Sequence, residues 1–335
     1  MARKPARCDV ALLVDEETGT YAESGRFIPE DDDVEEKVLR MLRARYRRVE
    51  VVPFSPKVAN TIAWLKRLRP RIVFNLTEWV DGDRKHDAAI AGLLDILRLR
   101  YTGTGPDGMR LARDKSLSKQ IVAGLGVPVP RHFIADSPGD ARGHRLTYPL
   151  IVKPLFGDGS EAINTRSLVR DARQLRARIS AIRRRLGEPV VCEEFIAGND
   201  LYVGLLGNQP RVMDPVELVV RSRHRSAPQF ATYRLKNDRR YRARWGVHYR
   251  RARLPASKRR ELRESSRRIF RALKLRDYAR LDFRLTPSGR FYFVEANPNP
   301  DLDPYALNRS GCFAGVPYER LVRAIVESAR RRGRR

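Results

Sequence analysis

The segment from Tyr278 to Pro298 constrains the fold most, because it predicts a β-hairpin whose two faces differ chemically. Its middle, Thr286-Pro-Ser-Gly289, fits a four-residue turn with proline second and glycine last. This register pairs Arg280 with Glu295 and Asp282 with Phe293. Side chains alternate along a strand, so one face is expected to carry Arg280, Asp282, Glu295 and Asn297. The other face is expected to be core and to carry Leu281, Phe283, Leu285, Tyr292, Val294 and Ala296.

The polar face of this hairpin has two interpretations. Two carboxylates and an amide, diagonally about 7 Å apart at Cβ, can converge on a hard cation. Oxygen ligands that leave room for water and phosphate suit Mg²⁺. Alternatively, Arg280 neutralises the acids in ordinary salt bridges. The hairpin alone does not separate the two.

Two other segments contain residues that suit a nucleotide. Lys153 ends a strand-like run and is followed by the loop Gly157-Asp-Gly159-Ser160, whose backbone N–H groups could hold phosphate oxygens. The lysine precedes the glycines, so this is not a P-loop, and an ordinary turn is the alternative. In the segment from Glu193 to Asp200, extended backbone could meet a base and a carboxylate could meet a ribose. The alternative there is a pair of solvated acids.

The first third of the chain alternates strand and helix patterns, which predicts a small parallel α/β domain. Its expected strands are 10–14, 49–54 and 72–76, and its expected helices are 34–46, 58–69 and 86–98, the first capped by Asp33. Further on, the sequence predicts helices at 114–124, capped by Asp114, and at 168–186, capped by Ser167. The remaining expected elements are strands near 132–135, 149–153, 162–165, 189–195 and 201–207, and helices at 257–273 and from Pro317. The strand-rich second half indicates α+β lobes.

The net charge of +28 could attract nucleic acid. However, only 11 of the 68 basic residues are lysines, and the arginines run through every expected element, which is typical of solvated faces. The basic end, with Arg330–Arg332, Arg334 and Arg335, is expected to be a disordered tail. No aromatic residues are interleaved with it to stack on bases. The sequence therefore disfavours nucleic-acid binding.

The sequence also bears on the cellular location of the protein and on the role of its cysteines. The longest apolar runs, such as Val10–Val14, are far shorter than the roughly 20 residues that span a bilayer. The N-terminus lacks the apolar stretch of a signal peptide. Cys8, Cys192 and Cys312 form no C-x-x-C pair, which argues against disulfides and structural zinc. We expect a cytoplasmic protein.

Several short motifs follow one another along the chain between about residues 72 and 304. These are Tyr101-Thr-Gly-Thr104, Asp114-Lys115 with Lys119, Gly126-Val-Pro-Val-Pro130, Val152-Lys153-Pro154, Glu193-Glu194-Phe195-Ile196 with Gly198, and Glu295-Ala-Asn297-Pro298. Together they resemble the ATP-grasp superfamily, and within it the D-alanine–D-alanine ligase-like group.

The resemblance implies an ATP-grasp fold, mixed α/β and α+β, in which two lobes sandwich ATP. The corresponding domains are residues 1–107 (the small N-terminal parallel α/β, or preATP-grasp, domain), 108–195 (the central lobe), 196–330 (the C-terminal lobe) and 331–335 (the basic tail).

The resemblance also implies roles for individual residues. ATP would be bound by Lys115, Lys153, Gly157, Gly159, Ser160, Glu193, Glu194, Ile196 and Asp200, with Asp200 standing where the family usually has glutamate. Two Mg²⁺ ions, with Mn²⁺ as an alternative, would be held by Asp282, Glu295 and Asn297. Arg280 and Lys236 would be catalytic.

The expected activity is ATP-dependent, ADP-forming ligation of a small carboxylate to an amine, through an acyl phosphate. A nucleotide-binding protein with a phosphotransfer or regulatory role is the alternative. The "LHG" segment of authentic D-alanine–D-alanine ligases is here Leu76-Thr-Glu78, and other substrate turns also differ. We therefore expect a different substrate, with a pocket that includes Glu16, Glu17, Glu78 and Asn299. A homodimer is expected by family analogy only.

Overall fold

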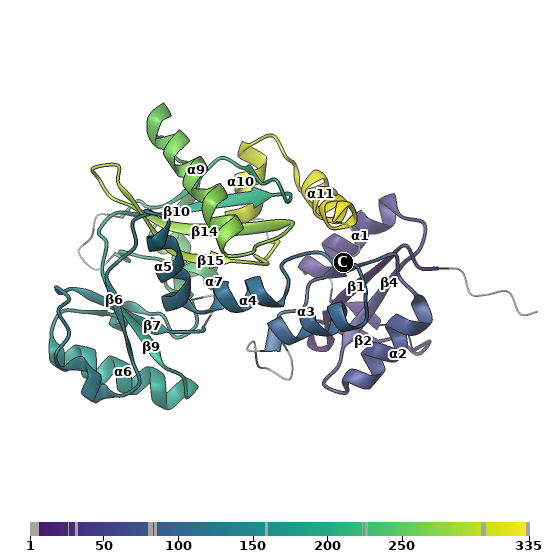
Figure 1. Ribbon diagram of the computed structural model, residues 1–335, viewed down its shortest axis with the longest axis horizontal. Coiled ribbons are helices and arrows are strands. Elements are labelled where there is room, and N and C mark those ends of the chain that lie inside the picture. Colours follow the sequence, from purple (N-terminus) through teal and green to yellow (C-terminus); the bar gives the residue numbers. More distant parts are fainter. Residues whose placement is uncertain are drawn as a thin grey trace, which may run out of the picture.

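The computed structural model describes residues 7–25, 27–30, 33–79, 83, 86–157, 160–222, 224, 227–302 and 306–332. The N-terminal domain lies at one end of the molecule, and two antiparallel sheets lie at the other (Figure 1). Helices α4 (Pro106–Arg113) and α5 (Lys115–Gly124) connect the two ends. None of the described helices is both long and apolar enough to cross a membrane.

The N-terminal domain contains a parallel sheet with strand order β4-β1-β5, as the alternating pattern predicts. Its strands are β1 (Val10–Asp15), β4 (Val49–Phe54) and β5 (Ile72–Asn75), and its helices are α1 (Val34–Arg45), α2 (Val58–Leu68) and α3 (Asp87–Ile96). A 3₁₀ turn (Glu16–Thr18) and the short pair β2 (Gly19–Tyr21) and β3 (Phe27–Pro29) follow β1. Asp33 stands at the N-cap of α1, but its side chain makes no capping hydrogen bond.

Helix α5 begins as predicted, because the carboxylate of Asp114 accepts hydrogen bonds from the backbone N–H groups of Ser116 and Leu117. Helix α4, immediately before it, is not among the predicted elements. Pro106 occupies its first turn, where the missing N–H does no harm. The glycine-rich run before Pro106 thus leads into a helix and is not simply a break.

The central lobe is a four-stranded antiparallel sheet in the order β6-β9-β7-β8, covered by α6 (Ala172–Leu186). Its strands are β6 (His132–Ala135), β7 (Leu150–Pro154), β8 (Leu168–Val169) and β9 (Val190–Glu194). Two predictions here are wrong. Asp171, not Ser167, caps α6, since Leu168 pairs with Ile151 in the sheet. No strand forms over 162–165, where 3₁₀ turn Thr165–Ser167 begins; a further 3₁₀ turn spans Pro138–Ala141.

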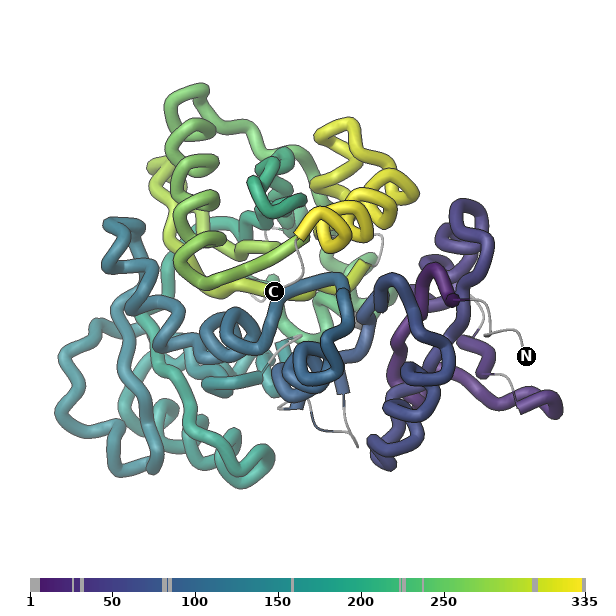
Figure 2. The backbone as a smooth tube through the Cα atoms, turned by 45° about the vertical axis from the view of Figure 1, so that its right-hand side comes forward, coloured from purple at the N-terminus to yellow at the C-terminus, as the bar shows by residue number. Residues whose placement is uncertain are grey.

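The C-terminal lobe is a six-stranded antiparallel sheet in which β13-β12-β10-β14-β15 are neighbours and β11 pairs with β10. The strands are β10 (Asn199–Leu206), β11 (Arg211–Val212), β12 (Val216–Val220), β13 (Val247–Arg251), β14 (Tyr278–Leu285) and β15 (Phe291–Asn297). The helices are α7 (Tyr233–Asn237), α8 (Arg239–Arg244), α9 (Ala256–Ala272), α10 (Ala306–Phe313) and α11 (Tyr318–Arg331). Helix α11 packs on the N-terminal sheet beside α1 (Figure 2).

The hairpin β14–β15 forms around the predicted turn, in which the Gly289 N–H donates to the Thr286 carbonyl. The predicted register is wrong, because Arg280 pairs with Asn297 and Asp282 pairs with Glu295. Gly289 has φ +79°, and the turn is one residue longer than expected. A β-bulge beyond Asp282 adds a second residue.

The longer turn changes part of the predicted core face. Phe291 and Phe293 are buried in the core, in place of Tyr292 and Val294. Val294 instead lines a pocket on the opposite face. The second slip restores the original alternation, so Glu295 and Asn297 still share a face with Arg280 and Asp282, as predicted.

The C-terminal arginines do not begin a tail at residue 331. Arg331 ends α11, and the guanidinium of Arg332 forms an ion pair with the fully buried Asp277 at 2.9 Å. Arg332 also donates to the carbonyl of Tyr101 in the N-terminal domain. Arg334 and Arg335 lie outside the described residues. Asp277 also accepts the N–H of Gly103, so this cluster joins three parts of the chain.

Replacing Arg332 with methionine is expected to lower the free energy of unfolding by about 2 to 3 kcal/mol, because Asp277 loses its paired cation. Urea denaturation followed by tryptophan fluorescence measures this change. Arg331→Met is the matched control, since its contact with Glu327 is 4.0 Å and exposed, and it should change stability by less than about 0.5 kcal/mol. Equal effects of both substitutions would contradict a role for the Arg332–Asp277 pair.

Candidate active site

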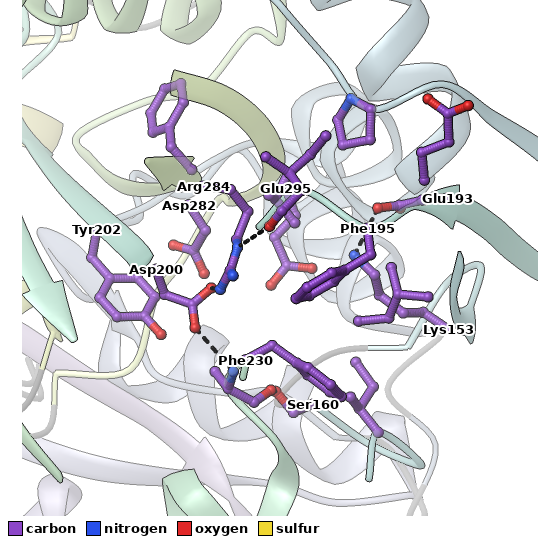
Figure 3. Close-up of a pocket in the computed structure, with 18 of the residues that line it drawn as sticks. Lys153, Ser160, Glu193, Phe195, Asp200, Tyr202, Phe230, Asp282, Arg284 and Glu295 are labelled. Atoms are coloured by element: carbon purple, nitrogen blue, oxygen red, sulfur yellow. Dashed lines mark hydrogen bonds and ion pairs between the residues drawn. The ribbon is translucent and has the colours of Figure 1, made fainter. Parts of the chain in front are cut away.

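A pocket of about 640 Å³ opens between the four-stranded and six-stranded sheets (Figure 3). Strands β7 and β9 reach it from one lobe, and β10, β14 and β15 reach it from the other. The segment before α7 contributes Phe230 and Ala231. The pocket brings together many of the predicted residues, namely Lys153, Ser160, Glu193, Glu194, Ile196, Asp200, Lys236, Asp282 and Glu295.

A smaller pocket of about 270 Å³ adjoins the first through Glu295, which lines both. Lys115, Gly157 and Asn297 line this second pocket, and the ammonium of Lys115 donates to the carbonyl of Gly157. Gly159 lies outside the described residues. The residues that line the two pockets therefore include the described nucleotide and metal candidates. Arg280 is hydrogen-bonded to one of them, Asp282.

Two lysines hold Glu193 in the wall of the larger pocket. The ammonium of Lys119 lies 2.8 Å from one carboxylate oxygen of Glu193, and that of Lys153 lies 3.0 Å from the other. Lys119 is fully buried and Lys153 is nearly so. The sheet pairing of β7 with β9 places Lys153 close to Glu193, and α5 brings Lys119 from the other side.

Burial and these ion pairs shift the pKa values of Lys119 and Glu193. Burial lowers the pKa of Lys119 from 10.5 to about 8, even though Glu193 opposes the shift. Burial alone would raise the pKa of Glu193, but the two lysines outweigh it and bring the value to about 2. Lys119 and Glu193 are therefore both charged at neutral pH. Between about pH 8 and 10.5 the unfolded state binds more protons at Lys119, so this lysine makes stability rise with pH.

Asp200 is held by a second buried arrangement, which Figure 3 shows beside the metal candidates. One oxygen of Asp200 accepts from Arg284 at 2.8 Å, and the other accepts from the N–H of Ala231 at 2.9 Å. The guanidinium of Arg284 lies 5.3 Å from the ring centre of Phe195. Asp200 thus faces the pocket with a fixed orientation and retains lone pairs for a ligand hydroxyl.

The metal candidates form a cross-strand group. Asp282 and Glu295 are direct partners in β14 and β15, and Arg280 binds Asp282 through two hydrogen bonds of 2.7 and 3.0 Å. Burial raises the pKa of Asp282, with Arg280 opposing the shift and Glu295 adding to it. Among the described residues, the buried amide nitrogen of Asn297 has no hydrogen-bond partner. Two carboxylates and an amide oxygen are a donor set that fits Mg²⁺.

The substrate candidates lie elsewhere in the described structure, and none lines either pocket. The amide oxygen of Asn299 accepts from the N–H of Thr104 at 2.8 Å. Glu16 accepts from Tyr21, Glu17 is exposed, and the Glu78 N–H donates to the carboxylate of Asp15. Their role in substrate binding stays a prediction.

Sequence reasoning assigned no role to Lys119 or Arg284. Arg284 alternates with Arg280 and Asp282 along β14, so period-two spacing places it on the same face and could have identified it. Lys119 follows Lys115 by one helical turn and shares its helix face. The burial of Lys119 against Glu193 depends on the packing of α5 beside β9, which is distant in the sequence, and carries no local signal.

Comparisons with known proteins agree with this architecture. Residues 126–327 match the family model described as "D-ala D-ala ligase C-terminus". A D-alanine–D-alanine ligase from Methylobacterium radiotolerans is 31% identical over 288 residues, which cover 84% of this chain and 87% of the relative. An uncharacterized protein, y4sG, from Sinorhizobium fredii is 31% identical over 271 residues, covering 78% of this chain and 75% of that protein.

Solved structures show the same fold. The D-alanine–D-alanine ligase of Bacillus anthracis, complexed with ATP, superposes with a TM-score of 0.71 at 19% identity and covers 97% of both chains. The VanG D-Ala:D-Ser ligase of Enterococcus faecalis gives a TM-score of 0.69 at 16% identity, covering 96% of this chain and 100% of that chain. The predicted mixed α/β architecture is confirmed. The chain belongs to the D-alanine–D-alanine ligase family and has its ATP-grasp fold.

Proposed function

We propose that this protein is an ATP-dependent ligase that joins a small carboxylate to an amine and releases ADP and phosphate. One observation carries the proposal. Asp282 and Glu295 lie opposite each other on β14 and β15, with Arg280 bound to Asp282, in a pocket that also contains Lys153. Phosphoryl transfer needs cations and carboxylates in such an arrangement and little covalent participation by the protein.

The lysines and the segment between β9 and β10, which connects the lobes, would bind the nucleotide. Lys115, Lys153 and the loop from Gly157 to Ser160 would contact the phosphates. The backbone from Glu194 to Ile196 would meet the adenine, and Asp200 would accept from the ribose hydroxyls. Glu193 has both oxygens next to lysines, so we assign it to positioning Lys153.

The reaction has two steps. An oxygen of the substrate carboxylate attacks the γ-phosphorus, the bond to ADP breaks, and an acyl phosphate forms. The amine then attacks the acyl carbon and a C–N bond forms. The C–O bond to the phosphate breaks, phosphate leaves with the bridging oxygen and the bonding electrons, and the nitrogen loses a proton. Arg280 would stabilise the oxyanion of this second step, and Lys236 would face the transferred phosphate. Magnesium held by Asp282, Glu295 and Asn297 would neutralise the phosphate oxygens.

The substrate is proposed to differ from a pair of D-alanines, because the substrate segments around Glu16, Glu17, Glu78 and Asn299 depart from the family pattern. Binding of two metal ions, use of Mn²⁺, a homodimer and a cytoplasmic location are further proposals.

Phosphate release from Mg-ATP tests the function. Purified protein is screened against a panel of carboxylates, amino acids and short peptides, each alone and in pairs. We expect release that requires both an acid and an amine, with no D-alanyl-D-alanine formed at typical enzyme rates of about 1 to 1000 per second. Rapid synthesis of that dipeptide would contradict the substrate proposal. Release that needs no amine would contradict the ligase proposal.

A further inference from the structure

All three nitrogens of the Arg284 guanidinium donate hydrogen bonds to acceptors that lie outside β14. Arg284 is buried on β14, two residues after Asp282. Its Nε donates to the carbonyl of Ile196 at 3.0 Å, and its Nη1 donates to Asp200 at 2.8 Å. Its Nη2 donates to the carbonyls of Gly198 and, at 3.0 Å, Gln229. Three carbonyls and one carboxylate therefore depend on one guanidinium.

Those partners belong to two distinct segments. Residues 196–198 connect β9 of the four-stranded sheet to β10 of the six-stranded sheet, so they join the two lobes. Gln229 begins residues 229–232, which lead directly into α7. We call residues 196–198 the lobe connector and residues 229–232 the α7 entry. The ring of Phe195, directly before the lobe connector, meets the ring of Phe230, within the α7 entry, edge to face at 6.0 Å between ring centres.

The α7 entry decides where Lys236 lies. The Ala231 N–H donates to Asp200, and the side chain of Thr232 caps α7 by accepting from the Leu235 N–H. Lys236, on the same helical turn, lines the pocket, and its charge lowers the pKa of Asp282. A displaced entry would therefore move Lys236 relative to the carboxylates.

We propose that Arg284 is a positioning residue that ties the lobe connector to the α7 entry and so holds Lys236 over the pocket. Only the expected effect of Arg284 on turnover rests on the proposed function. Its structural role does not. Lysine cannot replace Arg284 here, because an ammonium has three donors at a single point, whereas the planar guanidinium reaches partners on both segments. Without the guanidinium, three carbonyls and one oxygen of Asp200 each lose a hydrogen bond in the folded protein. Local opening of the α7 entry would let water replace these bonds, so the loss favours opening.

Limited trypsinolysis tests this geometry without any substrate, because α7 and α8 contain Arg234, Arg239, Arg240, Arg242 and Arg244. We expect cleavage at these arginines to be faster in Arg284→Met than in the wild type by about tenfold or more, since proteolysis follows the population of the opened segment. Cleavage after Arg173 and Arg176 of α6, mapped by mass spectrometry, should not change.

Arg290→Met is the matched control. Arg290 lies on the same hairpin and is exposed. In the interactions described, its side chain contacts only the face of Tyr292, at 4.9 Å from the ring centre, and its hydrogen bonds with Thr286 use the backbone of Arg290. It should cleave like the wild type. Arg284→Lys is expected to cleave nearly as fast as Arg284→Met, and it covers the case in which the methionine variant does not fold.

Three results would overturn the proposal. One is an unchanged cleavage rate in α7 and α8 for both Arg284 variants. Another is an equal acceleration in α6, which would show only a general loss of stability. The third is failure of both variants to fold, which would make Arg284 a residue of the folded core. Because trypsinolysis needs no turnover, absence of ligase activity would sink the proposed function while leaving this result intact. With an active acid–amine pair, we expect kcat of Arg284→Lys to fall by about tenfold or more.

Discussion

Replacing Glu193 with glutamine is expected to lower the free energy of unfolding by about 3 to 5 kcal/mol at neutral pH. The substitution keeps the shape of the side chain and removes its charge. Lys119 and Lys153 would then face each other across a neutral amide in a buried site. Two cations taken out of water need a counter-charge, and the structure places no other carboxylate in contact with both among the interactions described.

Urea denaturation at pH 7.5, followed by circular dichroism, measures this effect. Glu194→Gln is the matched control, because Glu194 is the next residue on β9 and its contact with Arg131 is partly exposed and 3.5 Å long. That change should cost less than about 1 kcal/mol. A loss of less than 1 kcal/mol for Glu193→Gln as well would show that the lysines do not depend on this carboxylate.

The pH dependence gives an independent check on Glu193. Its pKa is about 2 in the folded protein, against an ordinary value of 4.5. Because the folded value is the lower one, the stabilisation is complete above about pH 4.5 and is lost as the pH falls toward 2. The difference in stability between wild type and Glu193→Gln should therefore shrink across that window. A constant difference would contradict the assigned pKa shift.

Replacing Asp282 with asparagine is expected to reduce acid- and amine-dependent phosphate release by about a thousandfold or more. The amide loses the charge that the proposed magnesium site needs. It also offers only one oxygen to Arg280, whereas in the wild type the guanidinium of Arg280 donates one hydrogen bond to each oxygen of Asp282, at 2.7 and 3.0 Å. Both the metal position and the arginine that faces the oxyanion would be disturbed at once.

Initial rates of phosphate release with saturating Mg-ATP measure this loss, and a thermal melt confirms that the variant is folded. Asp136→Asn is the control, because Asp136 is exposed and its contact with Arg183 is 3.9 Å. It should retain activity within about twofold. If Asp282→Asn kept more than a tenth of the wild-type rate, the assignment of Asp282 to the metal site would be wrong.

The β14–β15 hairpin shows how far local patterns reach. Thr286 to Gly289 predicted the turn, and alternation predicted the shared face of Arg280, Asp282, Glu295 and Asn297. The pairing partners were wrong because a longer turn and a bulge each added one residue. Two slips of one residue cancel in a pattern of period two, so the functional face survived while Tyr292 and Val294 changed sides.

The partners of the buried charges were beyond local patterns. Glu193 lies 74 positions after Lys119, and Arg332 lies 55 positions after Asp277, as their numbers show. Spacing in the sequence says nothing about such pairs. For the same reason the predicted tail was partly wrong, since a run of arginines looks solvated until a buried aspartate is found beside one of them.

The sequence by itself determined many of the helices and strands, the order of the family motifs and most of the charged residues that line the larger pocket. Helix and strand periodicities and motif spacing are local properties. The tertiary structure alone decided that Glu193 holds two lysines, that Arg284 joins the lobe connector to the α7 entry, and that α11 completes the core of the N-terminal sheet. These depend on which distant surfaces exclude water together, and on charges that must find partners once buried.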